Sequence, residues 1–195
     1  TIPKNVSVLL ASCDVQQDRL EVQLVGWNRK KAFIIDYFIF DGNTFDLESH
    51  CWKELDELLK RTWTLTNKKE IEIRALSIDA QYNTTTVGKF ARCRRKVYPI
   101  NGLDRFDIPV HPPKPMMIKS NGKWIKTGKK RWPISSSLLK MDVYNRLKLD
   151  EDSQESISFC KGLPEEYYKQ LTAESLDIVT TNNNSIKHQW VKNYH

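Results

Sequence analysis

The chain has 195 residues, of which 39% are hydrophobic and six are tryptophan, and its formal net charge is +7. This length and composition can bury one sizeable core, so we expect a single domain over residues 1–195. No apolar run approaches the roughly 20 residues that span a bilayer, and no signal peptide precedes the first expected strand, so the sequence predicts no membrane association.

Residues 6–27 read as two strands joined by a tight turn at Gln16, Gln17 and Asp18. A single carboxylate, Asp14, lies within the first apolar run. An isolated charge in a buried strand is unfavourable unless something pairs with it. Two interpretations of Asp14 remain open at this point: it caps the turn, or it binds a metal ion.

The elements that follow alternate between strands and helices. A third strand is expected at 32–40, because it is dense in strand formers and ends at Asp41-Gly42-Asn43. Apolar residues spaced by three and four predict a helix at 48–61, with Trp52 and Leu55 on its buried side. We then expect a strand at 71–78 that ends on Asp79, a helix at 84–95, and a short strand at 97–100 that stops at Asn101-Gly102.

Three antiparallel strands followed by helix, strand, helix and strand predict an α/β fold with one mixed sheet flanked by helices. Functional groups gather at the carboxyl ends of parallel strands in such sheets. If the fourth strand lies beside the first, Asp14 and Asp79 come close together. Two carboxylates from adjacent strands, with a third from a later helix, form a site for two divalent cations that hydrolyse a phosphodiester.

Residues 112–132 contain seven basic residues and no acidic one, interleaved with Trp124 and Trp132. Lys and Arg release counterions from a phosphate backbone and aromatic rings stack or wedge, which favours nucleic-acid binding; a solvated loop is the alternative. Asn121-Gly122 between MMIKS and KWIKT predicts a type I′ hairpin. Our hypothesis is that this basic hairpin lies against duplex DNA near the metal site and positions the scissile phosphate. The candidate DNA-binding residues are Lys119, Lys123, Lys126, Lys129, Lys130, Arg131 and, more weakly, Lys140, for which a solvated helix face is the alternative.

The remaining residues predict a helix at 137–147, a strand at 157–160, a helix that starts at Pro164 and runs to Leu171, a loop at Asn182–Asn184 and a strand at 186–191. The four cysteines show no CxxC or Cys/His spacing, which predicts reduced thiols rather than disulfides or a zinc site.

Several strings, in this order along nearly the whole chain, resemble one family: CDVQQDRLEVQLVGW, IIDYFI, CWKELDELL, SID, YPINGLD, VYNRLKL and LPEEYYKQLTAE. They are similar to the nuclease domain of the large terminase subunit of tailed phages, of the lambda type (GpA family). The resemblance implies an RNase H-like fold and a Mg2+- or Mn2+-dependent endonuclease that cuts concatemeric phage DNA during packaging. It assigns metal binding and catalysis to Asp14 and Asp79.

The chain departs from that family's pattern at three places. Asp79-Ala80-Gln81-Tyr82 replaces Asp-Ser-Gly-Gly, and Ser135–Ser137 stand where Gly-Val-Asp is common. The family's third catalytic acid is expected just beyond His195. Two carboxylates alone would hold metal weakly, so we expect the fragment by itself to be inactive if that acid is required.

The resemblance also implies partners. They are double-stranded DNA, a terminase small subunit, the portal and procapsid, and an ATPase domain in cis, within the host cytoplasm. No GxxxxGK[ST] occurs, so we expect this chain to be the carboxyl-terminal part of a longer protein that carries the ATPase. Two alternatives to the terminase nuclease are a non-catalytic DNA-binding module and another RNase H-like nuclease, such as a resolvase or transposase.

Overall fold

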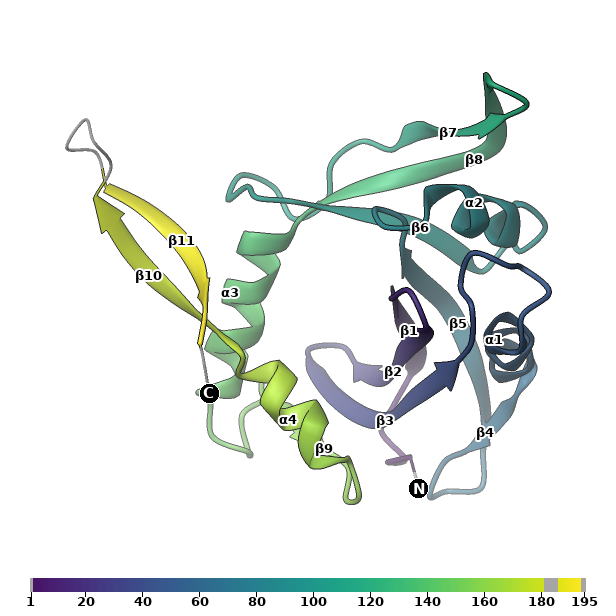
Figure 1. Cartoon of the computed structure of the whole chain (residues 1–195). Coiled ribbons are helices and arrows are strands. Elements are labelled where there is room, and N and C mark those ends of the chain that lie inside the picture. The colour runs from purple at the N-terminus through teal and green to yellow at the C-terminus, as the bar shows by residue number, and fades with distance from the viewer. Residues whose placement is uncertain (1, 181–185, 194–195) are drawn as a thin grey trace.

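The computed structural model describes residues 2–180 and 186–193, and a mixed β-sheet forms its centre (Figure 1). The sheet starts with the antiparallel strands β1 (Val8–Val15), β2 (Arg19–Asn28) and β3 (Lys31–Asp41). In β2, Leu20, Val22 and Leu24 are fully buried, so every second side chain enters the core. The predicted antiparallel meander is confirmed.

The later strands extend the sheet in parallel from β1. They are β5 (Glu70–Asp79), β6 (Val97–Leu103) and β8 (Lys123–Ser135). β5 pairs with β1, β6 with β5, and β8 with β6, all in parallel. Three more strands complete the sheet: β7 (Lys114–Ser120) on β8, β9 (Ile157–Phe159) on β3, and the short β4 (Thr62–Thr64) on β5. The fourth predicted strand therefore does lie beside the first.

Two helices cover one face of this sheet: α1 (His50–Lys60) and α2 (Thr84–Arg92) (Figure 1). Trp52 of α1 is 2% exposed and its ring centroid lies 4.9 Å from that of Phe90 of α2. Both rings join the strand residues of the main hydrophobic cluster. The main hydrophobic core therefore lies between these helices and the sheet. The opposite face of the sheet is not covered by α1 or α2.

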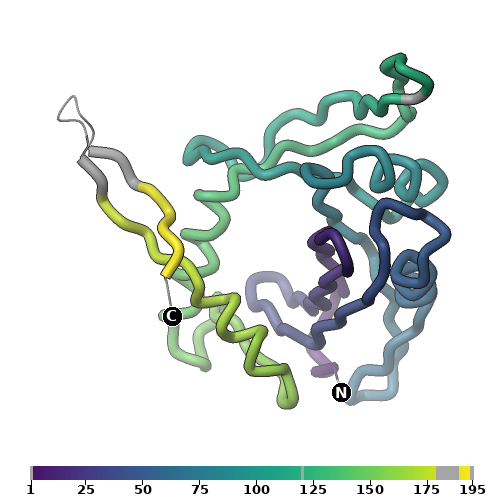
Figure 2. Tube along the Cα trace, in the orientation of Figure 1, coloured from purple at the N-terminus to yellow at the C-terminus, as the bar shows by residue number. Residues whose placement is uncertain are grey.

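The C-terminal third lies on that opposite side (Figure 2). It contains α3 (Ser136–Leu147), α4 (Glu165–Leu171) and a separate antiparallel pair, β10 (Glu174–Thr180) with β11 (Ile186–Lys192). β10 was missed by the sequence analysis. Its Ile178 is 69% exposed, and residues 174–176 are only partly buried, so the short alternation Ser175-Leu176-Asp177-Ile178 does not mark a core-facing strand.

Two predicted boundaries differ from the structure. The second helix ends at Arg92 rather than Arg95, and Arg94 instead pairs with Asp56 at 2.6 Å. The strand predicted to stop before Asn101-Gly102 continues to Leu103, because β8 supplies hydrogen-bonding partners there. The predicted loop at Asn182–Asn184 and His195 fall outside the described residues.

Candidate active site

Asp14 and Asp79 end adjacent parallel strands. Cys13 of β1 is in register with Ile78 of β5, and each carboxylate is the next residue along its strand. Cys13 and Ile78 are buried in the core, so the two aspartates that alternate with them face the opposite side of the sheet. Asp14 is exposed and Asp79 is half-buried. The predicted convergence of these two residues is confirmed, whereas their roles stay predictions.

The electrostatics of this pair favour a bound cation. Burial raises the pKa of Asp79, and the neighbouring negative charge of Asp14 raises it further; hydrogen bonds from the backbone N–H groups of Gln81 and Ala80 act in the opposite direction. Burial also raises the pKa of the neighbouring Cys13 thiol, and the negative charges of Asp14 and Asp79 raise it further. A positive charge placed between Asp14 and Asp79 would relieve this repulsion.

Gln81 holds the turn after Asp79, where the family pattern has glycine. Its backbone N donates to Asp79 Oδ1 at 3.1 Å. Its side-chain amide donates to the carbonyl of Gly102 and accepts from the N–H of Gly102, each at 3.2 Å. The Gln81 side chain thus ties the end of β5 to the end of β6, and this fixes the backbone that carries Asp79.

A third carboxylate, Glu21, lies near Asp14 and was not singled out from the sequence. Glu21 is the cross-strand partner of Asp14 and is only 8% exposed. It accepts hydrogen bonds from Tyr37 Oη at 2.5 Å and from Arg19 Nε at 2.7 Å. Pairing the strands around the turn at residues 16–18 would have revealed this neighbour. Its acceptor capacity is engaged by protein donors, which indicates a supporting role.

The chemistry of the donor set fits a hard divalent cation. Mg2+ and Mn2+ prefer carboxylate oxygens and are commonly held by one or two carboxylates together with water and phosphate. Asp14 and Asp79 supply such oxygens from a rigid strand edge. Across residues 2–180 and 186–193, no cluster of three or more His, Cys, Asp or Glu side chains is placed to hold an ion. Asp14 and Asp79 are therefore the two candidate ligands among the described residues, and their metal binding stays a prediction.

The serines that replace Gly-Val-Asp fix the start of α3. Ser135 Oγ donates to the carbonyl of Ile108 at 2.6 Å, and Ser136 Oγ donates to the carbonyl of Leu103 at 2.9 Å. Ser137 Oγ donates to Asp104 Oδ1 at 2.6 Å. These bonds attach the helix to the loop that follows β6, so the serines have a structural role at the same edge of the sheet as Asp79.

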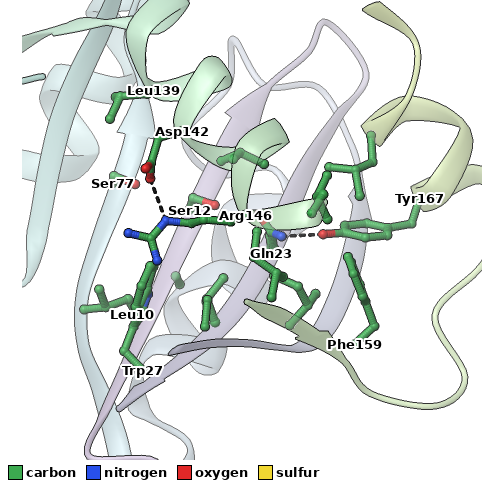
Figure 3. Close-up of a pocket in the computed structure, with 18 residues that line it drawn as sticks. Leu10, Ser12, Gln23, Trp27, Ser77, Leu139, Asp142, Arg146, Phe159 and Tyr167 are labelled. Atoms are coloured by element: carbon green, nitrogen blue, oxygen red, sulfur yellow. Dashed lines mark hydrogen bonds and ion pairs between the residues drawn. The ribbon is translucent and has the colours of Figure 1, made fainter. Parts of the chain in front are cut away.

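A cavity of about 490 Å3 lies between α3 and α4 and the face of the sheet that carries Asp14 and Asp79 (Figure 3). Leu10, Ser12 and Trp27 line it from the sheet, and Arg146 and Tyr167 line it from the helices. Arg146 is held there by Asp142 at 2.8 Å, and Tyr167 by Gln23. The lining is mainly apolar, so this cavity is distinct in chemistry from the carboxylate pair at the edge of the sheet.

The predicted basic hairpin is formed by β7 and β8. Asn121 and Gly122 have φ values of 48° and 76°, the left-handed values that a type I′ turn requires. Its base, where Lys114 pairs with Arg131, adjoins Trp132, and its predicted contact with DNA near the metal site stays a prediction. Asp79 is level with Ile100, which is level with Trp132, whereas Lys123 lies nine residues earlier on β8. From Lys130 to Lys123 the partner strand β7 advances only five residues, from Pro115 to Ser120, so the tip lies about seven residues, or roughly 23 Å, from the level of Asp79.

The structure separates the candidate DNA-binding residues by environment. Lys119, Lys123, Lys126 and Lys130 are exposed. Lys129 Nζ instead donates to the carbonyl of Arg94 at 2.8 Å. In the described part of the chain, Arg131 Nε is buried and has no hydrogen-bond partner.

Lys140 pairs with Glu174 and lies 5.7 Å from the centroid of the Trp190 ring. It therefore joins α3 to the β10–β11 pair. Its suggested phosphate contact stays a prediction, as do those of the hairpin residues.

The chain is an α/β protein with an RNase H-like fold. Its sheet starts with three antiparallel strands and continues with parallel strands, and helices flank it. The chain belongs to the family described as terminase large subunit gpA, endonuclease domain, which matches residues 1–195. The resemblance noted in the sequence is thus confirmed, and this family assignment replaces the resolvase or transposase alternative.

A solved structure, the large terminase from a thermophilic bacteriophage, has a similar fold. The TM-score is 0.53 at 12% sequence identity, and the match covers 99% of this chain and 38% of that one. A search of curated proteins gave no match. None of the helices in the described residues is long and apolar enough to cross a membrane.

Proposed function

We propose that this chain is a metal-dependent DNA endonuclease domain of a phage terminase large subunit, which cuts concatemeric viral DNA during packaging. The observation that supports this most directly is the placement of Asp14 and Asp79 at the ends of adjacent parallel strands. Within the gpA endonuclease family, a carboxylate pair at this edge of the sheet has an evident use in phosphodiester hydrolysis.

Each residue has a separate part in the proposed reaction. Asp14 and Asp79 hold Mg2+ or Mn2+ at a two-metal site and are the catalytic residues. When bound, the cations supply Lewis-acid stabilisation of the charge that develops on the phosphate oxygens and increase the acidity of the attacking water. Gln81 keeps Asp79 in place, and Glu21 with Tyr37 and Arg19 maintains the strand beside Asp14.

The rest of the proposed assembly lies outside this chain, which spans 38% of the large terminase from the thermophilic phage. A third acidic ligand is expected beyond His195. The proposed partners are an ATPase domain in cis, a terminase small subunit, the portal and procapsid, and double-stranded DNA, all in the host cytoplasm.

The first test is to soak Mn2+ into crystals of this chain and to locate it by anomalous scattering. We expect a peak between Asp14 and Asp79 in the wild type and its loss in Asp79→Asn. Asp150→Asn, in an exposed loop, is the matched control and keeps the peak. A wild-type crystal with no peak at the pair would refute the catalytic assignment.

A non-catalytic DNA-binding module is the second candidate. It is favoured by the presence of two rather than three clustered ligands among the described residues. Nicking of supercoiled plasmid by the full-length protein separates the two functions. The nuclease loses nicking in Asp14→Asn and Asp79→Asn but still binds DNA, whereas the binding module nicks in no variant.

A further inference from the structure

The face of the sheet that carries Asp14 and Asp79 continues onto the basic hairpin. Residues that are in register on neighbouring strands point to the same side of a sheet. Asp79 is in register with Ile100 of β6, and Ile100 is in register with Trp132 of β8. The side of β8 that carries Trp132 is therefore the side that carries Asp14 and Asp79.

Alternation and pairing extend this face to the tip of the hairpin. Lys130 lies two residues before Trp132 and pairs with Pro115; two residues further along β7, Met117 pairs with Lys126. Lys119 then pairs with Trp124. Lys119, Lys126 and Lys130 thus share one face with Trp124, whose side chain is 65% exposed.

The other face of the hairpin is attached to α2. Met116, Ile118 and Thr127 are buried there, and an added Cβ at Gly88 of α2 would lie 3.1 Å from Ile118 and 3.2 Å from Met116. Helix and hairpin are therefore in close contact, which holds the hairpin in a fixed direction relative to the sheet (Figure 1). Lys129, which binds the Arg94 carbonyl, belongs to this anchored side.

No acidic residue occurs in β6, β7 or β8, so nothing on these strands offsets the lysines. Tyr98, level with Ser77 and 44% exposed, adds an aromatic surface between the hairpin and the carboxylates. The roughly 23 Å from the level of Asp79 to the hairpin tip corresponds to about seven base pairs of B-DNA.

We propose that Lys119, Lys126, Lys130 and Trp124 form a second contact surface for the same DNA duplex, which extends along the strands from about 7 Å to about 20 Å from the level of Asp14 and Asp79. This inference rests on the proposed function. The lysines neutralise backbone phosphates, and the Trp124 ring packs against the sugar and base edges that a groove exposes at that distance. These contacts fix the position of the duplex rather than read its sequence.

The experiment measures the affinity of the full chain for duplexes of about 6, 12, 16 and 20 base pairs by fluorescence anisotropy, with and without Mg2+. At about 3.4 Å per base pair, a duplex shorter than seven base pairs reaches either the carboxylates or the hairpin tip, but not both. We expect wild-type affinity to rise between about 6 and 16 base pairs by tenfold or more. If a longer duplex only offered more overlapping positions for the same single contact, the increase in affinity would be much smaller.

Lys119→Gln with Lys126→Gln, and separately Trp124→Ala, should remove that rise. The double variant should also lower the slope of log K against log salt by about 1.8, since each phosphate contact contributes about 0.9. The matched control is Lys89→Gln with Arg92→Gln, which removes two exposed charges from α2 on the other side of the sheet. All four side chains of the two double variants are exposed, so thermal melting should be unchanged and loss of folding can be recognised.

Equal loss of affinity in the control and in the hairpin variants would mean that only net charge matters, and it would overturn the proposal. So would a wild-type affinity that shows no rise with duplex length. Because this assay detects binding and not cleavage, its result is independent of the proposed nuclease activity. Absence of plasmid nicking together with a normal length-dependent rise would refute the proposed function and leave the contact surface intact.

Discussion

Replacing Asp79 by Asn should stabilise the metal-free protein, because the mutual repulsion of Asp14 and Asp79 opposes folding. Strands in a sheet lie about 4.8 Å apart. Two charges at roughly that distance repel by about 0.9 kcal/mol at the dielectric constant of water and by about 3.5 kcal/mol at an effective value of 20. Asp14 is exposed, so the lower value is closer and we expect a gain of about 1 kcal/mol. For a protein of this size, this corresponds to about 2–4 °C in Tm.

The sign of the pH dependence follows from the raised pKa of Asp79. The folded state binds this proton more tightly than the unfolded state, so wild-type stability from this group is present at acidic pH and is lost as pH rises through the folded pKa. In EDTA at neutral pH, Asp79→Asn should therefore melt above the wild type. The difference should shrink as pH falls toward the ordinary aspartate pKa of about 3.9.

Thermal melting with and without Mn2+ completes the assay. A cation that binds only the folded state at 100 times its Kd adds about 2.7 kcal/mol, so Mn2+ should raise the wild-type Tm above that of Asp79→Asn. Asp150→Asn is the control and should follow the wild type in both conditions. The reasoning is refuted if Asp79→Asn melts no higher than the wild type in EDTA, or if Mn2+ raises both by the same amount.

Three further predictions concern the neighbouring residues. Gln81→Ala removes both side-chain hydrogen bonds to Gly102, so it should lower the free energy of unfolding by about 1–3 kcal/mol and weaken Mn2+ binding in calorimetry. Unchanged Mn2+ affinity would show that the Gln81–Gly102 hydrogen bonds do not position Asp79. Gly122→Ala places a side chain at a left-handed φ of 76°, at a cost of about 1–2 kcal/mol. Hydrogen exchange should therefore quicken in the hairpin and stay slow in β1. Equal quickening in both would contradict a local effect. Glu21→Gln removes the charged acceptor of the Tyr37 hydroxyl, so melting should show a loss of about 1.5–3 kcal/mol, and a stability equal to the wild type would mean that this buried bond contributes little.

Much of the fold could be predicted because its elements have strong local patterns. The first three strands, α1 and the strand ending at Asp79 follow the expected alternation and spacing closely. The hairpin was also predictable, since Asn121-Gly122 suits one turn type. β10 was not predicted, because its alternating stretch is only four residues long and its pairing with β11 joins that stretch to residues 188–191, ten or more positions further along the chain.

The candidate site was predictable in part. Asp14 and Asp79 could be found because each interrupts or ends an apolar strand, and their meeting required only that the first and fourth strands be neighbours. Glu21 and Gln81 could not be assigned roles from the sequence. Their importance comes from hydrogen bonds to Tyr37 and Gly102, which are 16 and 21 positions away.

The sequence by itself determined the strand and helix pattern, the two aspartates and the basic composition of the hairpin, because hydrophobic periodicity, turn propensity and charge are local properties. Only the tertiary structure decided that β8 continues the sheet beside β6, that the hairpin tip is roughly 23 Å from the level of Asp79, and that its lysines divide between an exposed face and an anchored one. The physical reason is that strand order and register arise from pairing between distant segments, and these pairings alone fix which side chains share a face.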